Sequence, residues 1–295
     1  MYTDFSNCKL CPKNCGADRN SGKLGFCRAT NKMEICRIGL HFWEEPVISG
    51  KNGSGTVFFA HCNLGCIYCQ NFEISKGSAA GKIYSAQDLA YEMINLQKNN
   101  AHNINLVTPT HYMPIIKDAV LKAKNMGLNI PIVYNTSGFE HPEIISSLKG
   151  TADIFLTDLK YFSPYYSKLY SNCEDYFDFA SKSIEAMINV TGNVKINSEN
   201  IMEKGVIIRH LMLPTLGDDT ARVLKYIANN FEDKVLVSLM RQYTPVCPGL
   251  PNELKRKITD REYNNAKELF DFLELEGFEQ EKSAAGIDKI PKWDI

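Results

Sequence analysis

Three features that would assign this chain of 295 residues to other protein classes are missing from it. No stretch approaches the roughly 18 consecutive apolar residues that a membrane-spanning helix requires. The first residues, MYTDFSNCKL, lack the charged and apolar regions of a signal peptide. The formal net charge is only -1, so no overall field attracts nucleic acid or an acidic membrane surface. We therefore expect a cytoplasmic protein that binds neither membranes nor nucleic acids.

Internal repeats and low-complexity tracts are also absent, which argues against solenoids and flexible linkers. Hydrophobic residues make up 44% of the chain, so a folded core is expected rather than disorder. The length suits one large α/β domain with a small appendage, or two modest domains.

Cysteine is scarce in the later part of the chain and dense near its start. Of the ten cysteines, only Cys173 and Cys247 follow residue 69, and we interpret these two as packing residues. Disulfides are rare in a reducing cytosol, and disulfide-bonded cysteines would be spread more evenly along the chain. The clustering of the other cysteines therefore favours metal binding.

From about residue 55, short apolar runs alternate with amphipathic stretches that have helical spacing. Ser85, Thr259 and Gly127 are typical helix-boundary residues, whereas the tyrosine-rich residues 160–180 suggest an irregular connection. Six apolar runs with crossovers predict a parallel sheet, and too few residues remain for an eight-stranded barrel. We predict a partial (β/α)6 barrel in residues 51–280, a loop-dominated Cys-rich segment in 1–50 and a tail in 281–295. The expected strands are 56–61, 103–108, 131–135, 153–157, 206–213 and 235–239.

The first predicted barrel strand ends in a loop with the spacing Cys62-x3-Cys66-x2-Cys69. Ligands of such folds lie beyond the carboxyl ends of the strands, so this loop is well placed for chemistry. Three neighbouring thiolates can hold one iron–sulfur cubane and leave its fourth iron open. A chelating α-amino carboxylate, as in S-adenosylmethionine (SAM), would fill that open position. Zinc is the rival interpretation, with His61 or a distant cysteine as fourth ligand.

This loop and several later stretches resemble the radical SAM superfamily, and within it the proteins related to pyruvate formate-lyase activating enzyme that lack a ferredoxin-like insertion. The likeness runs from about residue 8 to residue 265. It implies a [4Fe-4S] cluster, reductive cleavage of SAM to a 5′-deoxyadenosyl radical, and a flavodoxin or ferredoxin electron donor. The stretches that carry it are HFWEEPVISGKNGSGTVFFAHCNLGCIYCQNFEIS, AHNINLVTPTHY, IPIVYNTSGFE, DIFLTDLKYF, VIIRHLMLPTLGD and VSLMRQYTP.

The resemblance also suggests cofactor-binding residues at the predicted strand ends. Lys160 would neutralise the methionine carboxylate, and Asp158 would engage the cofactor or a monovalent cation. The Gly-Gly-Glu turn of activating enzymes is replaced here by Thr108-Pro-Thr110, where the Thr110 hydroxyl would substitute. His111 follows, as a pocket residue or as a structural one. The remaining expected contacts are Tyr68, Asn135, Arg209 and Gln242.

A second group of cysteines, Cys8-x2-Cys11-x3-Cys15-x11-Cys27, has the spacing of a four-thiolate site. It could hold structural Zn²⁺ or an auxiliary iron–sulfur cluster. Cys36 is a spare cysteine that could act as an alternative ligand of this site.

Two substrates fit a radical enzyme of this kind. One is a backbone glycine of a glycyl-radical enzyme; the other is a small molecule or peptide that is modified directly. The interpretation from a different class is a zinc-dependent binding module, against which the neutral charge speaks.

Overall fold

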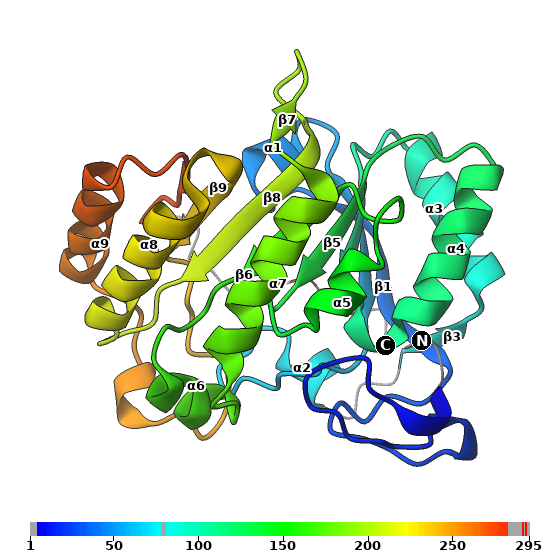
Figure 1. Ribbon diagram of the computed structural model, residues 1–295, viewed down its shortest axis with the longest axis horizontal. Helices are drawn as coiled ribbons and strands as arrows, with labels where there is room; N and C mark the ends of the chain where they lie inside the picture. The colour runs from blue at the N-terminus through cyan, green and yellow to red at the C-terminus, as the bar shows by residue number, and fades with distance from the viewer. Residues whose placement is uncertain (1–4, 78–80, 283–290, 292, 294–295) are drawn as a thin grey trace.

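The computed structural model describes residues 5–77, 81–282, 291 and 293 (Figure 1). Most of the predicted tail, residues 281–295, therefore lies outside the described residues. Within the described part, ten strands form one sheet. The strands are β1 (Met33–His41), β2 (Ser54–Phe59), β3 (Lys82–Tyr84), β4 (Ile104–Val107), β5 (Ile132–Thr136), β6 (Ile154–Asp158), β7 (Lys195–Ile196), β8 (Met202–Leu211), β9 (Leu236–Met240) and β10 (Gly277–Glu279).

The centre of the sheet consists of β2, β4, β5, β6, β8 and β9, which are parallel and adjacent in that order. These are the six predicted strands, so the parallel core of the partial barrel is confirmed. Their apolar runs are long enough to identify because strands of a parallel sheet are buried on both faces. A seventh parallel strand, β10, pairs with β9. This short strand was not predicted from the sequence.

The edge formed by β1 and β3 was not predicted. Residues 1–50 were expected to be dominated by loops, yet β1 is nine residues long and pairs antiparallel with both β2 and β3. Most of its side chains are only partly buried. Without the apolar alternation of a half-buried strand, this segment gave no strand signal.

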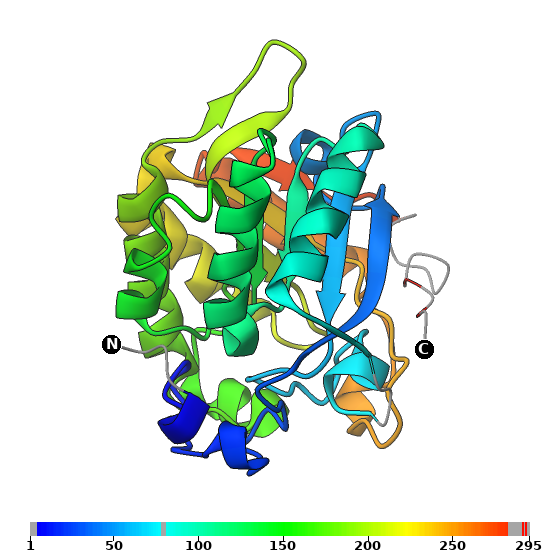
Figure 2. The same cartoon turned by 90° about the vertical axis from the view of Figure 1, so that its right-hand side faces the viewer.

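Helices cover the outer face of the parallel strands (Figures 1 and 2). Ser85 and Thr259 form the expected capping boxes. The prediction for residues 160–180 was wrong, because α6 and the start of α7 lie there, and Tyr170 and Tyr176 point into the core instead of marking a loop. The α-helices are α1 (Pro46–Ser49), α2 (Phe72–Ser75), α3 (Ala86–Lys98), α4 (Met113–Asn125), α5 (Pro142–Ser146), α6 (Pro164–Ser171), α7 (Tyr176–Thr191), α8 (Gly217–Phe231) and α9 (Asp260–Phe272).

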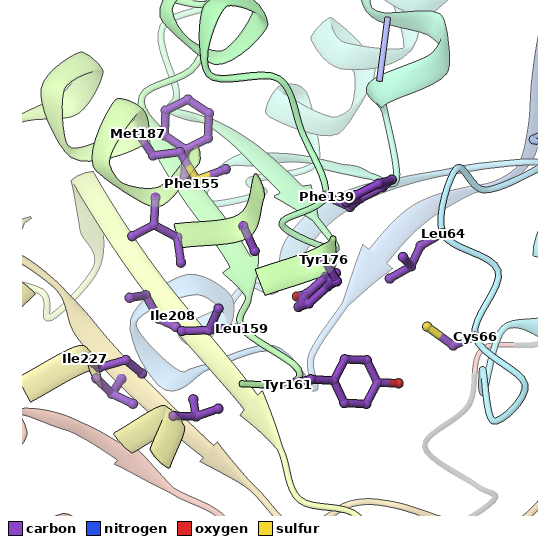
Figure 3. Close-up of a cluster of buried hydrophobic side chains, with 14 of the residues drawn as sticks. Leu64, Cys66, Phe139, Phe155, Leu159, Tyr161, Tyr176, Met187, Ile208 and Ile227 are labelled. Atoms are coloured by element: carbon purple, nitrogen blue, oxygen red, sulfur yellow. The ribbon is translucent and has the colours of Figure 1, made fainter. Parts of the chain in front are cut away.

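Strand alternation separates a helix-packed face from an inward face. On β4, Ile104 and Leu106 pack in an apolar core, whereas Val107 lines the interior of the barrel. The largest apolar core lies between β6, β8 and helices α7 and α8, and reaches the cysteine loop at Leu64 and Cys66 (Figure 3). No helix among the described residues is long and apolar enough to cross a membrane.

Candidate active site

The cysteine loop leaves the carboxyl end of β2 and turns into the barrel. His61 and Gly65 have φ angles of 73° each, in the left-handed region. At Gly65 a Cβ atom would lie 3.0 Å from Lys76 Cε, so the glycine allows both the turn and the close packing. The loop thereby directs Cys62, Cys66 and Cys69 to one cavity of about 610 Å³.

Each of the three sulfur atoms accepts at least one hydrogen bond. Leu64 N–H donates to Cys62 Sγ (3.4 Å), Ser171 Oγ to Cys66 Sγ (3.0 Å) and Ser75 Oγ to Cys69 Sγ (3.5 Å). Hydrogen bonds to sulfur are one of the means by which proteins tune a bound iron–sulfur cluster. Three thiols with directed donors around one cavity therefore fit an iron–sulfur cluster.

The same residues fit a single zinc ion poorly. Among the described residues, no three Cys, His, Asp or Glu side chains lie close enough together to hold one metal ion. His61 lies 3.3 Å from Glu34 (Nε2 to Oε2) and does not line the cavity, so it does not complete a tetrahedral set. A cubane presents several irons to its thiolates, and the cavity lining in the described part contains three cysteines for it. Burial raises the pKa of Cys62 to about 11.

A chain of hydroxyl groups connects the loop with the segment after β6. The Tyr161 hydroxyl donates to that of Tyr68 (2.7 Å) and lies 2.8 Å from Ser171 Oγ, which donates to Cys66. Tyr68 lines the cavity, as expected, and Tyr161 lies beside Cys66 in Figure 3. Ser171 and Tyr161 were missed because they belong to the segment that was misread as irregular.

Asp158 and Lys160 lie at the carboxyl end of β6, and both line the cavity. They form a half-buried ion pair. Burial by itself would lower the pKa of Lys160, but Asp158 and the nearby thiols of Cys66 and Cys69 raise it, and the net pKa is above its ordinary value. Lys160 is therefore a permanent cation close to two of the three cysteines.

Of the residues expected at the cavity from the turn after β4, only some line it. Thr108, with φ 60°, and Asn135 line it, and Thr108 N–H donates to Asn135 O (2.9 Å). Thr110 does not reach it, since its side chain is buried and its hydroxyl donates to Glu140. His111 is structural: its Nε2 lies 2.7 Å from Ala60 O, and burial lowers its pKa to about 3.

Glu140 is a buried acid that the sequence analysis did not single out. It accepts hydrogen bonds from Thr110 and Thr136 on one oxygen, and its Oε2 has no partner among the described residues. Burial raises the pKa of Glu140 to about 7.

Arg209 points into the cavity, as expected, and its neighbour His210 points to the opposite face because side chains alternate along a strand. Arg209 is held by two carboxylates, Glu44 and Glu45, that come from the loop before α1. Neither glutamate was predicted as a site residue. No local signal could have found them, since they meet Arg209 across 165 and 164 residues of sequence.

Gln242 lines the cavity after β9. Its carbonyl oxygen accepts from Gln70 Nε2 (3.1 Å) in the cysteine loop, and its side chain accepts from Gln280 (3.1 Å) beyond β10. Tyr243 is turned away and donates to Leu254 O (2.6 Å). Gln242 thus ties the far side of the barrel to the cysteine loop.

The other cysteine group forms a separate lobe, residues 5–32, against the same end of the barrel. Cys8, Cys11 and Cys27 are buried, and Cys15 is exposed. The lobe contains only two 3-10 turns of regular structure. Cys36 lies on β1 and packs near Phe58, away from the lobe. None of the lobe cysteines lines the cavity.

Buried Arg19 fastens the lobe to the barrel. Its Nη1 donates to His111 O (2.7 Å) and contacts Cys8 Sγ (3.7 Å). Phe26 N–H donates to Cys15 Sγ (3.4 Å). The backbone N–H groups of Lys13 and Ala29 donate to Cys11 and Cys27. All four sulfur atoms of the lobe therefore have hydrogen-bond donors.

A sequence model of the radical SAM superfamily matches residues 56–227. An uncharacterized protein of Methanocaldococcus jannaschii is 30% identical over 283 residues, which cover 92% of this chain and 76% of that protein.

Two solved structures share the fold. SuiB of Streptococcus suis bound to S-adenosylmethionine has a TM-score of 0.50 at 12% identity, over 76% of this chain and 49% of SuiB. HydG, a maturase of the [FeFe]-hydrogenase, has a TM-score of 0.53 at 12% identity, over 75% of this chain and 50% of HydG. The chain spans about half the length of each, and at these identities the likeness concerns the fold alone.

Proposed function

This chain belongs to the radical SAM superfamily, and on that premise we propose that it is a cytoplasmic enzyme that generates a radical on a substrate. The family implies a [4Fe-4S] cluster and SAM. The chemistry that these groups supply when bound is one-electron reductive cleavage of SAM to methionine and a 5′-deoxyadenosyl radical, which takes a hydrogen atom from the substrate. The observation that carries the proposal is the set of three cysteines, each with a hydrogen-bonded sulfur, around one cavity.

The residues of the cavity have distinct tasks in this proposal. Cys62, Cys66 and Cys69 hold the cluster and leave one iron for SAM. Lys160 neutralises the SAM carboxylate, because it remains a cation in a partly desolvated place beside the cysteines. Asp158 fixes the Lys160 ammonium group through their ion pair.

The polar strand ends orient the rest of the cofactor. Thr108, Asn135 and Gln242 offer hydroxyl and amide groups to its amino and adenosine parts. Tyr68 is immobilised by the hydroxyl of Tyr161 and limits the space next to the cysteines. Exclusion of water from this end protects a reactive radical from side reactions.

Two classes of substrate remain within this proposal. The resemblance to activating enzymes supports a glycyl-radical enzyme, whose backbone glycine would lose hydrogen. The departure at Thr108-Pro-Thr110, together with the cavity of about 610 Å³, supports a small molecule or a peptide. A flavodoxin or ferredoxin would supply the electron.

We also propose that the lobe cysteines, Cys8, Cys11, Cys15 and Cys27, hold a second metal, either Zn²⁺ or an auxiliary iron–sulfur cluster. The near absence of regular structure in the lobe supports this, because so short an irregular segment gains stability from a metal. The side chains would have to move to close such a site, because no three of them lie close enough together to hold one metal ion in the described part of the chain.

Anaerobic reconstitution tests the proposed function. Reduced protein with SAM should form 5′-deoxyadenosine and methionine in equal amounts. Deuterated candidate substrates, including a peptide with a dideuterated glycine, should transfer label to 5′-deoxyadenosine if they donate the hydrogen. Absence of 5′-deoxyadenosine from protein that contains a full cluster would contradict the proposal.

A further inference from the structure

The pair Glu44–Glu45 comes from the loop at the amino end of β2, and its partner Arg209 lies next to Asp158 in the sheet. The two glutamates follow β1 and precede α1, which is at the top of Figure 1, while α2, after the cysteines, is at the bottom. Both glutamates line the cavity, as does Arg209 on β8. We call Glu44, Glu45 and Arg209 the floor of the cavity.

The floor has two carboxylates, Glu44 and Glu45, and only one cation, Arg209, so one negative charge is not neutralised. Glu45 accepts from Arg209 Nε (2.7 Å) and Nη2 (2.5 Å), and Glu44 accepts from the same Nη2. Burial alone would lower the pKa of Arg209, but the two glutamates raise it above its ordinary value. Arg209 likewise holds the pKa of Glu45 low, against the effect of burial. Two carboxylates thus share one guanidinium in a place where solvent screening is weak.

No other cavity group supplies the missing positive charge. Lys160 is paired with Asp158. Burial lowers the pKa of His41, so this side chain is neutral near pH 7. Of the other carboxylates in the described lining, Asp158 is neutralised by Lys160 and Glu279 by Lys267, so neither cation is available to Glu44.

A second observation at the floor points to a hydrogen-bond donor as ligand. Asn105 is fully buried, and its Nδ2 donates to Glu44 Oε1 (2.9 Å). This bond fixes the orientation of the amide, and the Asn105 Oδ1 then has no hydrogen-bond partner in the described part of the chain. Asn105 does not line the cavity itself, but it contacts Glu44, which does, and it lies on the same face of β4 as the lining residue Val107. An unpaired buried acceptor is costly unless a donor reaches it.

Glu44 itself has room for a further donor. Each of its carboxylate oxygens accepts one hydrogen bond, and each can accept more. Its side chain is 9% exposed and lines the cavity. Trp43, next in the chain, lines the same cavity and adds an aromatic surface of the kind that attracts cations.

We propose that the floor binds the cationic group, an ammonium or guanidinium, of the substrate, with Glu44 as its counter-ion. This inference rests on the proposed function and names the substrate class for that site. A free amine and a basic side chain of a peptide share this chemistry. The cation would bring the charge that the floor lacks and further hydrogen-bond donors for Glu44, next to the unpaired oxygen of Asn105.

The test is binding to reconstituted holoenzyme in the presence of SAM, measured by anaerobic calorimetry. Pentylamine, pentanol and pentanoate have similar shapes and differ in charge. Pentylamine should bind at least ~10-fold more tightly than the other two, the tenfold that corresponds to one medium-strength ionic contact. An acetylated, amidated Gly-Lys-Gly peptide and its Gly-Gln-Gly counterpart form the second arm. Tighter binding of the lysine peptide than of pentylamine supports a peptide source, and the reverse supports a small amine.

Glu44→Gln should remove the preference for the cation and leave the Kd of SAM within about twofold. Glu279→Gln is the matched control, because Glu279 lines the same cavity but is paired with Lys267 (2.6 Å); it should keep the preference. Equal or tighter binding of pentanol or pentanoate to the wild type would overturn the inference, whatever the variants do. An unchanged preference in Glu44→Gln, or an equal loss of SAM affinity, would overturn it too. Failure of 5′-deoxyadenosine formation with an intact preference would count against the proposed function alone.

Discussion

The two cysteine groups of this chain lie at the same end of the barrel and differ in what they face. The sulfurs of Cys62, Cys66 and Cys69 surround a cavity and each accepts a hydrogen bond from a neighbour. The four lobe cysteines also have hydrogen-bond donors, but they do not line this cavity, and three of them are buried. Catalytic metal sites keep a position open for substrate, whereas structural sites are closed by protein ligands. The comparison therefore assigns chemistry to the loop and stability to the lobe.

The largest difference between the two groups is expected in activity. Cys66→Ala should lower 5′-deoxyadenosine formation by more than about 1000-fold, because a cluster with two protein ligands would not be held. Cys247→Ala is the control, since this cysteine is partly buried and donates only to Cys69 O (3.1 Å). Chromatography of anaerobic reactions measures both. If Cys66→Ala formed 5′-deoxyadenosine as fast as the control, the catalytic role assigned to the loop cysteines would be wrong.

Removal of lobe ligands should affect metal content and stability instead. The double variant Cys8→Ala, Cys11→Ala should lose one metal complement, keep the cluster of the loop, and unfold about 10 °C lower, as expected for loss of several kcal/mol in a protein of this size. Elemental analysis and thermal unfolding under anaerobic conditions measure these effects. Cys36→Ala, on β1, is the control that should keep both metals. Unaltered metal content in the double variant would reject the lobe site.

The stability of the folded protein should also depend on pH through Glu140, which lies between the turn after β4 and the turn after β5. Its folded pKa of about 7 lies above its ordinary value of 4.5, so its protonated form is favoured in the folded state. The stability linked to this group is complete below pH 4.5 and is lost as the pH rises toward 7. The loss should amount to about 3 kcal/mol.

Glu140→Gln should therefore unfold at higher urea concentration than the wild type at pH 8 and show no such gain at pH 4.5. Glu143→Gln, an exposed acid in α5, is the control without this effect. If both proteins keep the same difference at the two pH values, Glu140 is not the titrating group.

The smallest effect is expected at Lys160, which lies near the cysteine loop and is proposed to bind the SAM carboxylate. Lys160→Ala should weaken SAM binding by ~10- to 100-fold, since a hydrogen bond between charged groups contributes about 1.5–3 kcal/mol. Lys168→Ala, an exposed lysine of α6, should leave the Kd unchanged. Calorimetry with the reconstituted protein decides, and identical isotherms for Lys160→Ala and wild type would remove the role assigned to Lys160.

Much of the fold could be predicted because the six parallel strands are continuous apolar runs. The resemblance to activating enzymes suggested Asp158, Lys160, Asn135 and Gln242 at the strand ends, and in the structure these four residues line one cavity. The prediction that the Thr110 hydroxyl reaches the cavity was wrong, because a 3-10 turn, Thr110–Tyr112, directs this hydroxyl to the buried Glu140.

Other parts had no local signal. Strand β1 is only partly buried, so its sequence shows no regular alternation. The contact of Arg209 with Glu44 and Glu45 joins β8 to the loop before α1, and only the closure of the sheet brings these segments together. Long-range ion pairs of this kind follow from topology, which a single sequence does not reveal.

EPR spectroscopy of the anaerobically reduced protein, with and without SAM, tests the central claim most directly, namely that three cysteines hold a cubane with one iron open to SAM. The account predicts the signal of a reduced [4Fe-4S] cluster in the wild type, a changed signal when SAM is added, and loss of this cluster in Cys66→Ala but not in the lobe double variant. A wild-type sample without such a cluster, or a cluster signal that SAM leaves unchanged, would contradict it.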